Sequence, residues 1–203
     1  MTARVVPGIR NMGLPAGAQE FAPPLARDAV LDFWFKEISP EAWWKSDPAF
    51  DLEIRRRFGA VHEAASAGEL YQWRSEPRGR LAEIIVLDQF LRNVHRGSPK
   101  AFACDPLALA LAQEAVAGSH DVSLSPQERV FLYLPFMHSE SRLIHERAER
   151  LFASLGLEQN YEFELKHKAI IDRFGRYPHR NAVLGRESTP EELAYLEQPG
   201  SSF

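Results

Sequence analysis

The sequence predicts an all-α fold in which antiparallel helical hairpins pack as a bundle or a short superhelix. The first observation is that a residue able to cap a helix stands directly before proline at several places. The oxygen of such a residue accepts a free backbone N–H, and proline at the first helical position lacks the N–H that would be left unbonded. The second observation is that no sustained alternation of apolar and polar residues marks a strand. The cap–proline pairs begin at Ser39, Asp47, Ser98, Asp105, Ser125 and Thr189.

Apolar periodicity places the helices of the first half. The segment Arg27–Ile38 carries more large apolar side chains than a surface helix needs, which predicts burial on more than one side. A short helix is expected at Trp43 and Trp44. From Pro48 to about Ala67, and again from Gly79 to His95, apolar residues recur at helical spacing, and a glycine follows each segment as a C-terminal cap.

The second half continues the same pattern. Pro135 lies inside one predicted helix, where it removes a backbone hydrogen bond and is expected to kink or end that helix. Short connections between successive helices favour antiparallel neighbours. No repeat of fixed length is visible. The predicted helices are Asp105–Ala117, Pro126–His138, Glu140–Leu155, Asn160–Phe174 and Pro190–Leu196.

Length and composition set the class of protein. A chain of 203 residues suits one domain, which we expect at residues 25–198, after a loose N-terminal tail at residues 1–24 without the apolar run of a secretory signal. No apolar run approaches the roughly 20 residues of a membrane span, so no membrane partner is expected. The net charge of −4 argues against a nucleic-acid partner. A single cysteine, Cys104, excludes an intramolecular disulfide and predicts a reducing compartment, the cytoplasm.

The segment Arg173–Arg186 is too polar and too basic for a core segment, although it follows an apolar helix. Gly175, Pro178 and Gly185 fix an irregular backbone within it, and it contains no carboxylate. These features predict a loop that binds one or two anionic groups of a small ligand, and a solvated basic loop is the alternative. Its polar side chains are Arg173, Arg176, His179, Arg180, Asn181 and Arg186.

Several polar residues stand where the helical pattern requires apolar ones. Asp88 and Arg92 lie one turn apart on a buried stripe, and an ion pair between them would relieve the cost of burying the acid. His138 continues the apolar stripe of its helix, and Glu140 follows at the next helix junction. His167 lies on an apolar face, where a core histidine bonded to a backbone carbonyl is expected.

We expect these residues and the basic loop to line one cleft. Guanidinium groups would hold an anionic group there bidentately, and His138, Glu140 and His179 are candidate catalytic residues for proton transfer. The alternative is an internal network of ion pairs and hydrogen bonds without chemistry. The candidate ligand-binding residues are Asp88, Arg92, Asn93, Arg173, Arg176, Arg180 and Asn181.

Other kinds of site fit the sequence less well. Asp88, His138, Glu140 and His179 have the side chains of metal ligands, but the surrounding arginines would repel a cation, so no metal is predicted. Ser139 stands between a histidine and a glutamate, yet adjacent residues on a helix point in different directions and make a poor nucleophilic triad. No glycine-rich phosphate loop follows a strand, and no cofactor is predicted.

Three long motifs carry a resemblance to a known family. They are LDQFLRNVHRGSPKAFACD at Leu87–Asp105, ERVFLYLPFMHSE at Glu128–Glu140 and RFGRYPHRNAVLGRESTPEELAYL at Arg173–Leu196, with LDFWF at Leu31–Phe35 before them. In this order they resemble the bacterial family known as domain of unknown function 924, over Ala29–Leu196. The resemblance implies an all-α fold similar to tetratricopeptide-type helical hairpins. It implies no particular activity.

Two positions depart from the pattern of that family. Leu91 stands where the family usually has proline, which is expected to straighten the helix, and Ser141 and Arg142 stand where an acidic residue is common. The second departure weakens any mechanism that needs another carboxylate there. By the resemblance, the motif positions fall on Asp88, Gln89, Arg92, Asn93, Arg96, His138, Ser139, Glu140, Arg173, Arg176, His179, Arg180, Asn181, Arg186, Ser188 and Glu191.

Two classes of function remain open, and so does the oligomeric state. The first is a site for a small anionic ligand, with or without catalysis, which would place Arg92, His138 and Arg180 around one void. The second is an interaction module for a protein or peptide partner, in which the same residues are scattered or buried as braces. The aromatic side chains that support the second class are Trp34, Trp43, Trp44, Tyr71 and Trp73.

Overall fold

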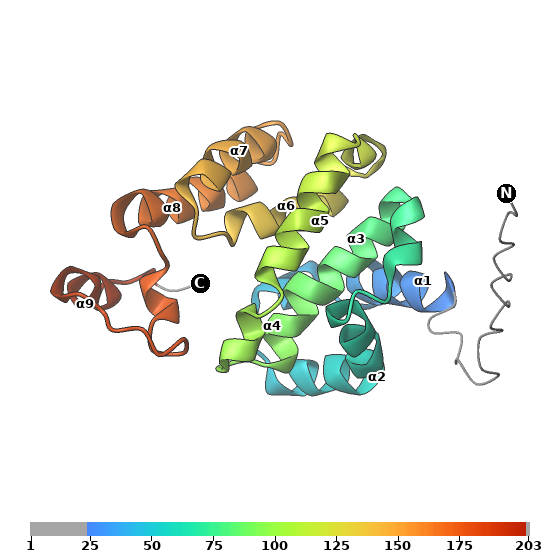
Figure 1. Ribbon diagram of the computed structural model, residues 1–203, viewed down its shortest axis with the longest axis horizontal. Coiled ribbons are helices and arrows are strands. Elements are labelled where there is room, and N and C mark those ends of the chain that lie inside the picture. The colour runs from blue at the N-terminus through green and yellow to red at the C-terminus, as the bar shows by residue number, and fades with distance from the viewer. Residues whose placement is uncertain (1–23, 202–203) are drawn as a thin grey trace, which may run out of the picture.

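The computed structural model describes residues 24–201, and within them the chain forms helices and no strands (Figure 1). The all-α prediction is therefore confirmed. The predicted N-terminal tail lies outside the described residues except for Pro24, which begins the first helix. The tetratricopeptide-like arrangement and the single-domain boundaries stay predictions.

The helices follow one another with short connections. The α-helices are α1 (Pro24–Asp32), α2 (Pro48–Ser66), α3 (Pro77–Ile85), α4 (Leu91–Val94), α5 (Asp105–Ala117), α6 (Pro126–Met137), α7 (Arg142–Ala153), α8 (Glu158–Phe174) and α9 (Pro190–Leu196). The 3₁₀ turns are η2 (Pro40–Trp44), η3 (Tyr71–Ser75), η5 (Pro99–Phe102), η6 (His120–Ser123) and η7 (Pro178–Arg180). Two π-helical turns, η1 (Phe33–Glu37) and η4 (Val86–Phe90), extend α1 and α3.

The capping predictions hold at four of six places. The side chains of Asp47, Ser98, Ser125 and Thr189 accept backbone N–H groups, and the last two form capping boxes with Glu128 and Glu192. Ser39 makes no such bond. The prediction for Asp105 is wrong, because Cys104 occupies the cap position and Asp105 is the first residue of α5. The carboxylate of Asp105 instead accepts hydrogen bonds from Arg92 and Arg180.

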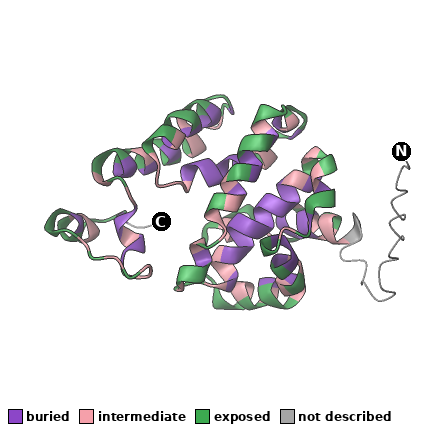
Figure 2. Ribbon diagram, viewed as in Figure 1, coloured by how far each residue is buried: buried purple, intermediate pink, exposed green. Residues whose placement is uncertain are grey.

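The main core surrounds one central helix. Every residue from Leu81 to Leu91 is buried, and α1, α2, α5 and α6 pack around this segment (Figure 2). The prediction for the first helix is confirmed, since Val30, Leu31 and Trp34 are almost completely buried. Pro135 lies two residues before the end of α6, so this helix ends close to where the proline predicted.

The π turn η4 interrupts the predicted helix Gly79–His95 without breaking it. A π turn bonds each N–H one residue further back than an α-helix does, so it contains one extra residue. All five residues of this turn are buried, including the polar neighbours Asp88 and Gln89. The helix therefore brings two polar side chains into the interior in the middle of an apolar segment.

A second, smaller apolar cluster holds the C-terminal part. It contains Ile170, Ile171 and Tyr177, with Phe174 and Tyr195 packed against it. In Figure 1, α9 lies at the end of the molecule beyond α8, and the chain between them carries the basic loop. None of the helices within residues 24–201 combines the length and the apolarity needed to cross a bilayer.

Candidate functional site

The basic loop starts where α8 ends. Gly175 terminates the helix in the left-handed conformation, at φ 70°, which favours glycine. The short turn η7 then places Tyr177 and Arg180 in the interior. The backbone N–H of Arg186 donates to the carbonyl of Asn181, which closes the loop on itself. The loop is thus a folded element and not a fully solvated basic segment.

A buried carboxylate and an imidazole form the first pair of the site. Asp88 is 1% exposed, and its Oδ1 lies 2.8 Å from Nδ1 of His138, which follows the last residue of α6. Gln89 donates to the other oxygen of Asp88 at 2.6 Å. Burial would raise the pKa of Asp88, but the charge of Arg92 and the hydrogen bonds from His138 and Gln89 hold it well below its usual range. Asp88 is therefore ionised, and it fixes the orientation of the His138 ring.

Arg92 joins this pair to a second carboxylate. Its Nη1 lies 3.3 Å from Asp88 Oδ1, which is the predicted i, i+4 ion pair. The same guanidinium donates bidentately to Asp105, at 2.9 and 3.1 Å. Desolvation and the charge of Arg92 lower the pKa of His138, so its imidazole is held neutral.

Arg180 lies on the other side of Asp105. It is 7% exposed, and its guanidinium stacks between the rings of Phe102 and Tyr177, at 4.7 and 4.5 Å from their centres. Its ion pair is a single contact of 3.4 Å to Asp105, and its Nε is buried without a hydrogen-bond acceptor in the described part of the chain. Desolvation and the nearby charge of Arg92 lower the pKa of Arg180. We call Asp88, Arg92, Asp105, His138 and Arg180 the arginine cluster.

A second set of residues fastens the loop, and we call it the loop brace. Arg186 donates to both oxygens of Glu140, at 2.6 and 2.9 Å, and the N–H of Tyr177 donates to Glu140 as well. Burial would raise the pKa of Glu140, but these bonds lower it overall. Arg176 donates bidentately to Glu192, at 2.6 and 2.7 Å, and Asn181 also donates to Glu192. The loop brace thus consists of Glu140, Arg176, Asn181, Arg186 and Glu192.

Tyr177 stands between the two sets. Its ring lies within 6.3 Å of the rings of His145, His167 and His179, and its hydroxyl donates to the carbonyl of Met137 at 2.5 Å. Burial lowers the pKa of His167 to about 3 and, with the charge of Arg180, that of His179 to about 4. His167 Nδ1 lies 2.7 Å from the carbonyl of Phe163, which is the backbone bond predicted for it. His167 and His179 are therefore neutral, the first buried and the second half-buried.

The structure brings some of the predicted site residues together and separates others. Asp88, Arg92, His138 and Arg180 share the arginine cluster, and Glu140, Arg176 and Asn181 belong to the loop brace. His179 packs on Tyr177 beside Arg180. Asn93 points away and donates to Asp51, at 2.8 Å. Arg173 pairs with Glu191 at the surface, where both side chains are largely exposed.

Sequence reasoning missed three residues of the site. Asp105 is expected only as a helix cap, and neither Glu192 nor Tyr177 is among the predicted site residues. Glu192 does fill its place in the capping box while it binds Arg176. The basic loop has no carboxylate of its own, yet Arg173, Arg176, Arg180 and Arg186 each pair with one from another segment. The sequence did contain a signal: the segments that supply these carboxylates have more acidic residues than their own helix caps need.

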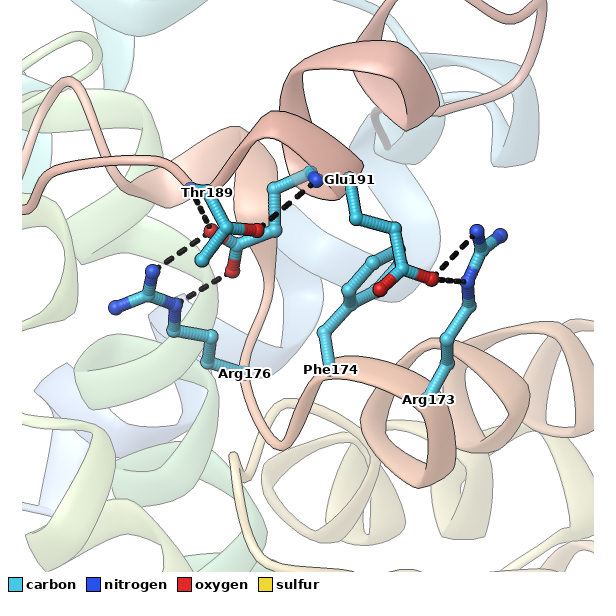
Figure 3. A pocket seen from close by; sticks show the side chains of 6 residues that line it. Arg173, Phe174, Arg176, Thr189 and Glu191 are labelled. Carbon is cyan, nitrogen blue, oxygen red and sulfur yellow. Dashed lines mark hydrogen bonds and ion pairs between the residues drawn. The ribbon is translucent and has the colours of Figure 1, made fainter.

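Two hollows open beside the loop brace, and neither is lined by Arg92, His138 or Arg180. The first, of about 360 Å³, lies between α8 and α9 and has Phe174 between the ion pairs Arg176–Glu192 and Arg173–Glu191 (Figure 3). The second, of about 280 Å³, shares Arg173 and Phe174 with it. Among residues 24–201, no three histidine, cysteine or acidic side chains are grouped to hold a metal ion.

Comparison with known proteins gives a family and a fold. The family model described as "Bacterial protein of unknown function (DUF924)" matches residues 30–200. A solved structure, that of a protein of unknown function, ATU0120, from Agrobacterium tumefaciens, is 44% identical with a TM-score of 0.81, over 85% of this chain and 97% of that one. No curated protein sequence matches the chain.

Proposed function

Since the chain belongs to the DUF924 family of bacterial proteins of unknown function, we propose its function from geometry: it binds a small ligand through a carboxylate or phosphate group at Arg180 and His138. The observation that carries the proposal is the state of Arg180. The guanidinium is buried, cationic and bound to one carboxylate oxygen at 3.4 Å. The single cysteine fits a reducing compartment, and we place the protein in the cytoplasm.

The contrast with Arg186 supports this choice. The side chain of Arg186 makes four hydrogen bonds, to Glu140, Asn181 and the carbonyl of Tyr177, whereas the side chain of Arg180 makes one. Burying a guanidinium without acceptors is costly, and an anionic group that accepts two parallel N–H bonds would offset that cost. Phe102 and Tyr177 keep the plane of the guanidinium fixed, so the site is preorganised for a planar or tetrahedral anion.

His138 supplies the second contact. With Nδ1–H donating to Asp88, the neutral ring has its lone pair at Nε2, which can accept from a hydroxyl of the ligand. The same arrangement makes His138 the best general base of the three candidates. Glu140 is less suitable, because Arg186 and the N–H of Tyr177 already occupy its oxygens. Any proton transfer is therefore assigned to His138.

Two observations favour a second candidate, in which the cluster is only a structural brace: the ion pairs, and the two hollows described above, neither of which is lined by Arg92, His138 or Arg180. Arg92 binds Asp105 bidentately, and Arg176 and Arg186 bind carboxylates in the same way. A protein built in this way could act through its surface as an interaction module. The two candidates differ in what removal of the Arg180 charge would do.

The test is a thermal shift assay of the wild type, Arg180→Met and Arg173→Met against inorganic phosphate, acetate and a panel of phosphorylated and carboxylated metabolites. Methionine keeps the apolar stem between Phe102 and Tyr177. We expect a ligand at a hundred times its Kd to stabilise the wild type by about 2.7 kcal/mol and Arg173→Met equally, but not Arg180→Met. If no compound shifts the wild type, while Arg180→Met alone lowers the melting temperature, the cluster is a brace.

A further inference from the structure

A second surface feature lies on the outer side of α8 and is separate from the arginine cluster. It is the 280 Å³ hollow between α8 and the segment around α9, which we call the α8 groove. Its apolar wall consists of Ala169, Ile170, Phe174 and Tyr195. The rings of Phe174 and Tyr195 lie 5.1 Å apart and form one continuous aromatic edge.

One exposed aromatic side chain continues the groove along α8. Phe163 is 49% exposed and lies two turns before Ile170 on the same helix, since residues seven apart share a face. Apolar side chains that form one contiguous exposed surface, unlike those exposed singly, mark a contact site for other molecules.

Cations stand at both ends of this apolar wall. Lys166 is at one end, over the ring of Phe163, and takes part in no ion pair among residues 24–201. Arg173 is at the other end, 4.6 Å from the centre of the Phe174 ring, and its partner Glu191 is exposed. Seven residues of α-helix separate the two cations, a rise of roughly 10 Å.

We propose that the α8 groove binds a short acidic segment of a partner protein, with a bulky apolar side chain on Ile170 and Phe174 and carboxylates beside Lys166 and Arg173. We choose an acidic partner because its charge is complementary to the groove, in which two cations flank the apolar wall. In an extended segment, residues two and four positions apart lie on one face, so two carboxylates four residues apart, about 13 Å, flank an apolar side chain that faces the same way. The long side chains of Lys166 and Arg173 span the difference from their own separation. Glu191 competes for Arg173, so it limits the affinity of the groove for an acidic segment.

The experiment is a titration of the ¹⁵N-labelled full chain with the peptide acetyl-Glu-Ser-Phe-Ser-Glu-amide, and separately with acetyl-Lys-Ser-Phe-Ser-Lys-amide, followed by amide chemical shifts. We expect the acidic peptide to shift the amides of Ile170, Phe174 and Tyr195, and the basic peptide to leave them unchanged. Equal shifts with both peptides would mean nonspecific apolar contact and would overturn the proposal. The absence of any shift with the acidic peptide would also overturn it.

Three variants sharpen the result. Lys166→Gln should weaken binding of the acidic peptide about two- to fivefold, the usual range for a surface ion pair. Lys168→Gln is the matched control, because Lys168 lies on the same helix but pairs with Asp172, and it should bind as the wild type does. Glu191→Gln should tighten binding by freeing Arg173. If Lys166→Gln and Lys168→Gln weaken binding equally, long-range charge explains the affinity, and the groove is not the site.

Discussion

Nδ1 of His145 lies 2.8 Å from Oε1 of Glu164, and both side chains are completely buried between α7 and α8. Nε2 of His145 lies 2.9 Å from the carbonyl of Ser139. A carbonyl only accepts, so Nε2 carries hydrogen, and a further proton must lie between Nδ1 and Oε1. Burial raises the pKa of Glu164, which favours the state in which the shared proton is on its carboxyl group.

The first prediction follows from this shared proton. Glutamine at position 164 carries an N–H that can donate to His145 Nδ1 in place of the carboxyl proton. We expect Glu164→Gln to change the free energy of unfolding by less than about 1 kcal/mol, and Glu164→Ala to cost about 3 kcal/mol or more, because it leaves Nδ1 unbonded beside a cavity. Urea denaturation measures both. Equal losses for the two variants would show that the pair is an imidazolium and a carboxylate.

The second prediction concerns acid. The pKa of His167 is about 3 in the folded protein and that of His179 about 4, both below the value of about 6.5 in an unfolded chain. The unfolded state therefore binds more protons, and the stability that these groups provide is complete above pH 6.5 and is lost as the pH falls towards 4. Each contributes a slope of at most about 1.4 kcal/mol per pH unit.

Urea denaturation between pH 7 and pH 4 measures this slope, and His167→Asn should make it shallower. Glu164 acts in the opposite direction, because its raised pKa favours the folded state at low pH. The pKa of Glu192, lowered to about 2 by the hydrogen bonds from Arg176, adds a loss only as the pH falls below about 4.5. A stability that stays level from pH 6.5 to pH 5 would contradict the prediction for the histidines.

The third prediction compares two glycines inside helices. A Cβ added at Gly79 would lie 1.9 Å from the carbonyl oxygen of Trp73, which is backbone and cannot move aside, whereas a Cβ at Gly59 would meet nothing within 4 Å. Gly79→Ala should therefore destabilise strongly by displacing η3 from α3. Gly59→Ala should stabilise by roughly 0.5–1 kcal/mol, because alanine is the better helix former. Thermal unfolding of the two variants measures these changes in stability. A Gly79→Ala variant as stable as the wild type would contradict the close contact with Trp73.

The fourth prediction tests the centre of the arginine cluster. Asp88→Ala removes the acceptor of His138 and Gln89 and the partner of Arg92, and breaking a buried pair in this way costs about 3–5 kcal/mol. Asp88→Asn preserves shape but removes the charge. Its amide can still donate to His138, which would reverse the tautomer and place the hydrogen on Nε2. The ¹⁵N shifts of the His138 ring report that change, and an unchanged tautomer would show that Asp88 does not fix it.

The sequence predicted the parts of this structure that depend on neighbouring residues. The capping boxes at Ser125 and Thr189 formed because each cap and its glutamate lie three residues apart in the chain. Asp105 also stands directly before a proline, but it is bound by Arg92, thirteen positions away, and by Arg180, seventy-five positions away. No pattern among neighbouring residues indicates contacts between positions so far apart in the sequence.

The candidate site was predictable in part for the same reason. Asp88 and Arg92 were identified by their misfit with an apolar stripe, and the structure pairs them. Asn93 was included because it adjoins Arg92, yet successive residues on a helix point about 100° apart, so it reaches Asp51 instead. The arginines of the basic loop were recognised as a group, but their partners come from other helices and appear only when the chain has folded.

The π turn at Val86–Phe90 is the place where the central helix can lose one residue without turning its two halves relative to each other. A π turn uses one more residue than an α turn for nearly the same rotation, so removing one residue there would let the helix wind regularly. Removing one residue from a regular part of the helix would instead turn one half by about 100° relative to the other. Single-residue gaps among homologous chains, where they occur in this helix, should therefore fall within Val86–Phe90.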